Sequence, residues 1–184
     1  MDSQSKTIND MLELVSLSDN RITPIPEKIM LYRCLTEMLP EFRMVAEAHE
    51  LRISLFVSED TECYADSGML SKVLTNVLLN AVQNTPPGEE VRIWVEPILD
   101  FIRVCILNTG VYLEEDVLSK LFDPFYRVDK VRNRKSGRSG LGLTIVRKTL
   151  ETMDLDFGLT QTKEGILFWM EIPTGSNENS VFYR

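Results

Sequence analysis

Residues 70–86, LSKVLTNVLLNAVQNTP, decide the fold of this chain, because two stripes of different chemistry run along one predicted helix. The first stripe is apolar at helical spacing and stops at residues 85–88, TPPG, which end the helix. Its members are Leu70, Val73, Leu74, Val77, Leu78, Ala81 and Val82. The sequence therefore predicts a core helix over residues 68–84, capped by Asp66-Ser67.

The second stripe on this helix is polar. Asn76, Asn80, Gln83 and Asn84 follow one another at i, i+4, i+7 and i+8, which places them on one face. Asn is a mediocre helix former, so this density of Asn indicates a polar task. Carboxamide oxygens can ligate a hard cation such as Mg²⁺, and carboxamide amides can donate to phosphate oxygens. An ordinary solvated face is the alternative.

A glycine-rich turn over residues 137–143, GRSGLGL, leads directly into a second predicted helix over 141–153. Glycines let backbone N–H groups approach phosphates closely, and a helix N-terminus adds the positive end of a dipole. The turn is not a Walker A loop, since no Gly-Lys-Ser/Thr follows, and it does not directly follow a strand in a βαβ unit. Alone, such a turn is only a weak indication of phosphate binding.

The segment that leads into this turn is strongly basic. Residues 127–138 hold six bases and one acid, a local charge of +5 in a chain of net charge −8, so the remainder carries −13. The bases are Arg127, Lys130, Arg132, Arg134, Lys135 and Arg138. A basic loop beside a glycine-rich turn in an acidic protein favours a polyphosphate ligand over a nucleic-acid backbone. A solvated basic loop is the alternative.

Composition narrows the class of protein. The chain has 184 residues, 43% hydrophobic and 26% charged, as expected for one soluble globular domain. No apolar stretch approaches membrane-spanning length, and the N-terminus lacks a secretory signal pattern. Cys34, Cys63 and Cys105 lie far apart and are expected to be core residues of a reducing compartment. The single histidine, His49, excludes a metal site built on several histidines.

The remaining pattern mixes helices with hairpins. Helices are expected over 5–17, 27–48 (kinked or divided at Pro40), and 114–121, and strands over 53–57, 91–95, 101–107, 155–160 and 166–172. We therefore expect an α+β fold, a two-layer α/β sandwich. Its mixed, mostly antiparallel sheet of about five strands is covered by about three helices on one face.

Four motifs in this order resemble those of the ATP-binding catalytic domain of bacterial sensor histidine kinases, in the GHKL superfamily with the Bergerat ATP-binding fold. Residues 70–86 resemble its N box, residues 108–110 (NTG) its first glycine box, residues 121–129 (LFDPFYRVD) its F box, and residues 137–143 its second glycine box. Residues 63–66 resemble the strand that leads into the N-box helix, and the likeness covers residues 24–173.

The resemblance implies a site for the cofactors ATP and Mg²⁺. Asn80 would ligate the metal, Asn76 and Arg127 would complete the catalytic set, and Asn108 would face adenine. A mobile lid would span residues 123–139. The other residues implied in nucleotide binding are Gln83, Asn84, Gly110, Tyr112, Leu113, Phe125, Gly137, Arg138, Ser139, Gly140, Leu141, Gly142 and Leu143.

Four positions depart from the family pattern. Asn108 stands where the family usually has Asp, and Tyr112 replaces the second glycine of the first glycine box. Gln83 replaces a common Lys, and Asn84 a common Tyr. An amide oxygen can still accept a hydrogen bond from the adenine N6 amine. We therefore expect weaker nucleotide binding than in a standard member.

The resemblance also implies the reaction. Related ATPases carry Glu as general base at the position of Asn76, which cannot take a proton near neutral pH. The γ-phosphoryl group would go to a histidine on a separate helical domain. Residues 48–52, AHELR, resemble the acceptor box only superficially, because a strand begins at Ile53, so His49 is not expected to be the acceptor. The alternatives are a degenerate nucleotide- or protein-binding module without kinase activity, or a GHKL ATPase.

Three segments are expected. Residues 1–20 resemble the end of the dimerisation and phospho-acceptor hairpin, residues 21–174 the catalytic domain, and residues 175–184 a flexible tail. The expected partners are the acceptor domain of the same receptor, a response regulator, and a second copy of the full-length protein. No nucleic acid or membrane is expected to contact this chain, which would be the cytoplasmic part of a cell-membrane sensor.

Overall fold

A five-stranded mixed sheet forms the centre of the fold in the computed structural model, which describes residues 3–18, 22–128 and 139–175. Its strand order is β2-β4-β5-β7-β6. The strands are β2 (Arg52–Phe56), β4 (Glu90–Ile98), β5 (Phe101–Thr109), β6 (Phe157–Gln161) and β7 (Gly165–Pro173). Only β2 and β4 are parallel among these neighbouring pairs. The predicted mixed, mostly antiparallel sheet is confirmed.

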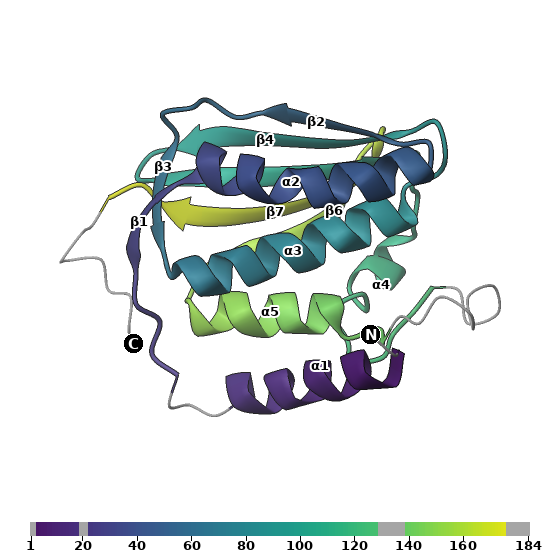
Figure 1. Cartoon of the computed structure of the whole chain (residues 1–184), viewed down its shortest axis with the longest axis horizontal. Helices are drawn as coiled ribbons and strands as arrows, with labels where there is room; N and C mark the ends of the chain where they lie inside the picture. Colours follow the sequence, from purple (N-terminus) through teal and green to yellow (C-terminus); the bar gives the residue numbers. More distant parts are fainter. Residues whose placement is uncertain (1–2, 19–21, 129–138, 176–184) are drawn as a thin grey trace.

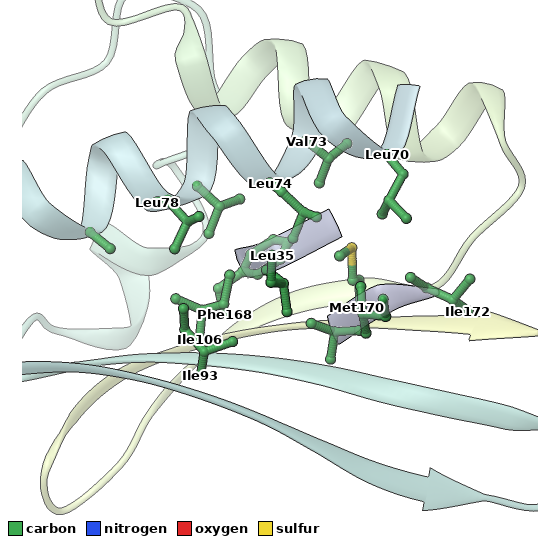
Figure 2. Close-up of a cluster of buried hydrophobic side chains, with 14 of the residues drawn as sticks. Leu35, Leu70, Val73, Leu74, Leu78, Ile93, Ile106, Phe168, Met170 and Ile172 are labelled. Atoms are coloured by element: carbon green, nitrogen blue, oxygen red, sulfur yellow. The ribbon is translucent and has the colours of Figure 1, made fainter. Parts of the chain in front are cut away.

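Three helices cover one face of this sheet: α2 (Leu31–Ala48), α3 (Ser67–Asn84) and α5 (Gly142–Thr152) (Figure 1). The core lies between the two layers. Figure 2 shows Leu35 of α2 and Leu74 of α3 in one cluster with Ile93, Ile106 and Met170 of the sheet, and all five side chains are fully buried. Each such side chain stabilises the fold by about 1.5–3 kcal/mol. The predicted two-layer sandwich is confirmed.

Helix α1 (Ser3–Ser18) lies outside the two layers and packs against α5 (Figure 1). Leu17 is its buried contact and joins a small cluster with Leu141 and Ile145. Four other apolar side chains of α1 are between 43% and 71% exposed. They are Ile8, Met11, Leu12 and Val15. The predicted N-terminal helix therefore forms, but most of its apolar residues do not enter the core.

The segment before α2 differs from the prediction. Residues Glu27–Met30 form strand β1, which pairs antiparallel with β3 (Glu62–Ala65) in a separate two-stranded sheet. Proline residues at 24 and 26 hold the preceding chain extended, and Ile29 pairs with Cys63 in the core. The helix predicted from residue 27 is therefore wrong over these four residues, because tertiary pairing overrides local periodicity.

Of the predicted kink or division at Pro40, the division is wrong, because helix α2 is continuous through this residue. Leu35 and Leu39 on one side of Pro40, and Phe42 and Ala46 on the other, are buried in the same core. Pro40 itself is exposed, so water can satisfy the carbonyl that lacks its helical donor. Packing on both sides keeps the helix whole.

The other elements agree closely with the prediction. The hairpins β4–β5 and β6–β7 form where expected, and β4 and β5 extend a few residues further than the pattern indicated. Helix α4 (Glu115–Leu118) is the predicted short helix. The order of these elements puts the end of β5, the end of α3 and the start of α5 at one end of the molecule (Figure 1).

Candidate functional site

Helix α3 carries the predicted polar stripe and is fixed at both ends. The Asp66 carboxylate accepts from the backbone N–H of Met69 at 3.0 Å, as the capping prediction requires, and from that of Ile25 at 3.0 Å. At the other end, the Thr85 hydroxyl donates to the carbonyl of Ala81 at 2.9 Å. Because the apolar face is buried along the whole helix, the polar stripe cannot rotate away from its position.

Two amide nitrogens of the polar stripe, those of Asn76 and Asn84, bond to α3 itself. Asn84 Nδ2 donates to Oδ1 of Asn80 at 2.7 Å and to the backbone carbonyl of Asn80 at 2.7 Å. Asn76 Nδ2 donates to the carbonyl of Lys72 at 3.0 Å. Asn76, Asn80 and Gln83 are half-buried. A carboxamide oxygen has two lone pairs, so Asn80 Oδ1 can accept from Asn84 and still face a cation.

The start of α5 meets this stripe at Gly142. A Cβ atom on Gly142 would lie 3.2 Å from Oδ1 of Asn76, closer than nearly all real Cβ contacts. The backbone N–H groups in the first turn of a helix lack intrahelical partners and form the positive end of its dipole. The structure therefore brings Asn76 of the polar stripe and Gly142 of the second glycine box together, as the sequence predicted.

The F-box residues lie against the same glycine-rich turn. The backbone N–H of Phe125 donates to the carbonyl of Gly140 at 3.1 Å, and both residues have left-handed backbones, with φ of +61° and +71°. A Cβ atom on Gly140 would lie 3.2 Å from Cα of Phe125 and 3.4 Å from Cγ of Arg127. Arg127 is thus adjacent to the start of α5. The predicted site residues Gly137 and Arg138 lie outside the described part of the chain.

Side chains of the turn itself attach it to the protein. The Ser139 hydroxyl donates to Oδ2 of Asp10 on α1 at 2.7 Å and accepts from the N–H of Leu141 at 3.3 Å. Leu141 is fully buried, and Leu143 packs against the main core. These three side chains hold the turn in place. No feature of the sequence singles out Asp10, which lies far away along the chain.

The end of β5 reaches the C-terminal end of α3 through Asn108. Its Nδ2 donates to the carbonyl of Ala81 at 3.1 Å and to Oγ1 of Thr85 at 3.3 Å. Gly110 follows with φ +71°, and a Cβ atom there would lie 2.7 Å from Cγ of Glu89. The left-handed backbone and this close approach therefore favour glycine at position 110. The structure places the first glycine box beside the N-box helix.

Tyr112 and Leu113 follow the first glycine box and contact the β6–β7 hairpin. The Tyr112 hydroxyl donates to the carbonyl of Lys163 at 3.1 Å, and the backbone N–H of Leu113 donates to Oε1 of Gln161 at 2.9 Å. These contacts join both residues to the β6–β7 hairpin rather than to α3. The Tyr112 side chain is 62% exposed. The structure thus does not bring it to the asparagine stripe.

A polar cavity of about 290 Å³ lies beside Gly110 and Tyr112. It is lined by Arg52, Gly88, Glu89, Glu90, Arg92, Thr109, Gly110, Tyr112, Lys163 and Glu164, and so by no residue of α3. Arg92 bridges Glu90 at 2.7 Å and Glu164 at 2.6 Å. The hydrogen bond from Ser54 and the Arg92 guanidinium lower the pKa of Glu90. This cavity is separate from the asparagine stripe, which we regard as the functional site.

The first turn of α5 holds a feature that was not predicted from the sequence. Thr144 lies in the first turn of α5, and its hydroxyl is buried without a hydrogen-bond partner among the described residues. A buried unpaired hydroxyl is unfavourable, so this side chain lowers the stability of the fold. A threonine at this helical position is ordinary, and no sequence signal distinguishes it.

The donor set fits a hard cation held together with phosphate. The carboxamide oxygen of Asn76 lies near the start of α5, where Gly142 has no side chain to fill the space, and Asn80 follows one helical turn later on the same face of α3. Residues 3–18, 22–128 and 139–175 contain no cluster of three or more His, Cys, Asp or Glu that could hold a metal.

A membrane-spanning helix is not found within the same described ranges, because none of their helices combines the necessary length and apolar character.

Comparison with known proteins identifies the family. Residues 65–176 match the family described as histidine kinase-, DNA gyrase B-, and HSP90-like ATPase. The chain belongs to this family. Its matched region contains the N-box helix, both glycine boxes and the F box, so the resemblance drawn from these motifs is confirmed.

The relatives and solved structures that resemble this chain include a sensor protein and a histidine kinase. Sensor protein VanSB of Enterococcus faecalis (strain ATCC 700802 / V583) is 51% identical over 176 residues, which cover 96% of this chain and 39% of VanSB. The chain thus spans about two fifths of that relative's length. ShkA in complex with AMPPNP has a TM-score of 0.78 at 23% identity, over 92% of this chain and 36% of ShkA. ThkA in complex with response regulator protein TrrA has a TM-score of 0.77 at 22% identity, over 95% of this chain and 49% of that one.

Proposed function

We propose that this chain is the catalytic domain of a two-component sensor histidine kinase. It binds Mg-ATP and transfers the γ-phosphoryl group to a histidine on a helical domain outside the chain, for relay to a response regulator. The observation that carries the proposal is the contact between Asn76 of α3 and Gly142 at the start of α5. It brings the carboxamide oxygen of Asn76 to the first turn of α5, where backbone N–H groups have no partner within the helix. The family match and the sensor VanSB support the same assignment.

Each part of the site has a role in this proposal. Asn80 Oδ1 would hold Mg²⁺, with Asn76 and Gln83 beside it, and Mg²⁺ when bound supplies neutralisation of phosphate charge. Backbone N–H groups at Gly140 and Gly142 and the guanidinium of Arg127 would meet the phosphates. Asn108 would face adenine, with Gly110, Tyr112 and Leu113 at the edge of the base site. Phe125 would anchor the lid against Gly140.

The chemistry of Asn76 favours transfer over hydrolysis. A carboxamide does not accept a proton near neutral pH, so Asn76 cannot activate a water molecule as a general base. The chain therefore contributes by positioning phosphates and balancing their charge. His49 is not the acceptor in this proposal. It caps the C-terminal end of α2, and Arg52 begins strand β2 three residues later, so it does not lie on a helical hairpin.

The proposal extends to the parts around the catalytic domain. Residues 1–20, which contain α1, would be the end of the phospho-acceptor hairpin, residues 21–174 the catalytic domain, and residues 175–184 a tail. The hairpin would dimerise the full-length protein, a cell-membrane sensor. That ThkA forms a complex with a response regulator supports a response regulator as the downstream partner.

The experiment combines nucleotide binding with phosphotransfer. Calorimetry would measure ATP affinity with Mg²⁺ and with EDTA for the unmodified chain and for Asn80→Ala. We expect Asn80→Ala to lower the affinity for Mg-ATP by about tenfold, since it removes a ligand oxygen, and to change the metal-free affinity much less. Asn9→Asp, at an exposed position of α1, is the control.

The second step supplies the acceptor separately. The chain is mixed with ATP labelled in the γ-phosphate and with a helical acceptor domain from the parent receptor. Label appearing on a histidine of that domain supports the kinase. Binding without transfer would favour a degenerate module, and steady release of phosphate in the absence of acceptor would favour an ATPase.

A further inference from the structure

Asn108 is held in one orientation by two oxygen atoms at the end of α3, and we propose that this orientation selects the base of the nucleotide. The inference rests on the proposed function, in which Asn108 faces the base. Ala81 and Thr85 direct the nitrogen of the Asn108 carboxamide inward. The oxygen then remains for the ligand, and Thr85 acts as a positioning residue for purine recognition.

The identity of the inward atom follows from what its partners can do. The carbonyl oxygen of Ala81 can only accept, so the Asn108 atom that lies 3.1 Å from it must be the nitrogen. An oxygen in that place would put two acceptors in contact. Thr85 also favours the nitrogen of Asn108 in this inward position. Its hydroxyl donates to the same carbonyl at 2.9 Å, which turns a lone pair toward Asn108 Nδ2 at 3.3 Å.

Burial makes this orientation difficult to reverse. Thr85 is 6% exposed and Ala81 is 1% exposed, so water has little access to replace either partner. A flipped carboxamide would lose its bond to Ala81 and place oxygen against oxygen. Among the described residues, Oδ1 of Asn108 accepts no hydrogen bond. It is therefore the atom available to a base.

A fixed acceptor discriminates at position 6 of a purine. Adenine carries an amine there, which donates to Oδ1, whereas hypoxanthine and guanine carry a carbonyl, which opposes it. We expect a preference for ATP over ITP of about tenfold or more. The Asp common at this position in the family would not need neighbours to fix its orientation, because both oxygens of a carboxylate are acceptors. Asn can donate or accept, so its orientation has to be set by neighbours.

This difference between Asn and Asp supplies the test, a double-mutant cycle read as the ratio of ATP to ITP affinity. The variants are Thr85→Val, which keeps the shape and removes the hydroxyl, Asn108→Asp, and the two combined. In the background of Asn108, Thr85→Val should reduce the ATP:ITP ratio by about threefold. In the background of Asn108→Asp it should leave the ratio unchanged. Thr85→Ser keeps the hydroxyl and should keep the ratio.

The outcomes separate this inference from the proposed function. If Thr85→Val leaves the ratio unchanged, or changes it equally in both backgrounds, the inference is wrong while ATP binding stands. If the unmodified chain binds neither nucleotide, the proposed function fails and the inference with it.

A measurement on the unmodified chain covers the case in which Thr85→Val does not fold. The side-chain amide protons of Asn108, followed by NMR in ¹⁵N-labelled protein, should exchange slowly with water both before and after ATP is added. Rapid exchange in either state would overturn the inference.

Discussion

The Nδ2 atom of Asn84 donates to Oδ1 of Asn80 at 2.7 Å, and Oδ1 of Asn80 is the proposed metal ligand. A second bond from the same nitrogen to the backbone carbonyl of Asn80 fixes the Asn84 side chain one helical turn away. A donor is thus held against one lone pair of the ligand oxygen, and the other lone pair has a defined direction. Asn84, which departs from the family pattern, therefore contacts the proposed metal ligand directly.

Replacing Asn84 with Ala should weaken Mg-ATP binding. Without the hydrogen bond, the Asn80 carboxamide gains rotational freedom that metal binding must remove, and we expect a loss of about threefold in affinity. Affinity for ATP measured in EDTA should not change. Calorimetry with and without Mg²⁺ checks this, with the exposed Thr75→Ala on the same helix as control. An equal loss with and without the metal would contradict the role assigned to Asn84.

Gly142→Ala should separate nucleotide binding from stability. The added Cβ would lie 3.2 Å from Oδ1 of Asn76, so the start of α5 must move away from the stripe. We expect Mg-ATP affinity to fall by about threefold to tenfold. Folding stability should change by no more than about 1 kcal/mol, because Ala is a better helix former than Gly.

The matched control for that substitution is Gly68→Ala. Gly68 lies in the first turn of α3, and a Cβ there would meet Oδ1 of Asp66 at an ordinary 3.5 Å. This variant should retain full nucleotide affinity. If both variants bind nucleotide equally well, Gly142 is not required for space at the site.

Thr149→Val should stabilise the protein. Thr149 is fully buried in α5, and its hydroxyl has no hydrogen-bond partner within the described residues. Val has nearly the same shape and no polar atom to desolvate, so the free energy of unfolding should rise by about 1 kcal/mol. Urea denaturation measures this. Thr152→Val on the same helix is the contrast, because it removes a bond to the Lys148 carbonyl at 2.7 Å and should give no gain.

Acid should destabilise the protein partly through Glu90. The hydrogen bond from Ser54 and the charge of Arg92 lower the pKa of Glu90 from its ordinary value of 4.5. The unfolded state therefore binds this proton first as the pH falls. The stabilisation is complete above pH 4.5 and is lost as the pH falls through the lower folded-state pKa.

Ser54→Ala tests this assignment, because it removes the largest cause of the shift. The variant should be less stable at neutral pH and should lose less stability on acidification. Denaturation midpoints measured from about pH 7 to pH 3 show the difference. Ser119→Ala, whose hydroxyl bonds only a backbone carbonyl, is the control. Parallel pH profiles for Ser54→Ala and the unmodified chain would contradict the role of Ser54.

The fold was largely predictable because its helices and hairpins carry strong local patterns. In α3, the apolar and polar stripes follow one period, so local preference and tertiary burial agree. Strand β1 was missed because residues 27–30 continue the pattern of the following helix, and only pairing with Glu62–Ala65 reveals the strand. The continuity of α2 at Pro40 likewise depends on core contacts made on both sides of the proline.

The candidate site was predictable as a set of residues, and less so as a set of contacts. Asn80, Asn108 and Gly142 carry motif and chemistry that the sequence displays. The bonds from Asn108 to Ala81 and Thr85, and from Ser139 to Asp10, join residues far apart in the chain. Local spacing contains no information on such partners, because the packing of α1, α3 and β5 creates them.

The sparse attachment of α1 has a consequence for local unfolding. Among its described side chains only Leu17 is buried, and the bond from Asp10 to Ser139 is its polar contact to the glycine-rich turn. A helix with so little buried area should open as a separate cooperative unit, at a free energy well below that of global unfolding. In hydrogen exchange, the amides of α1 should therefore exchange earliest among the long helices. Each opening would release Ser139 and uncover Leu141 at the edge of the proposed nucleotide site.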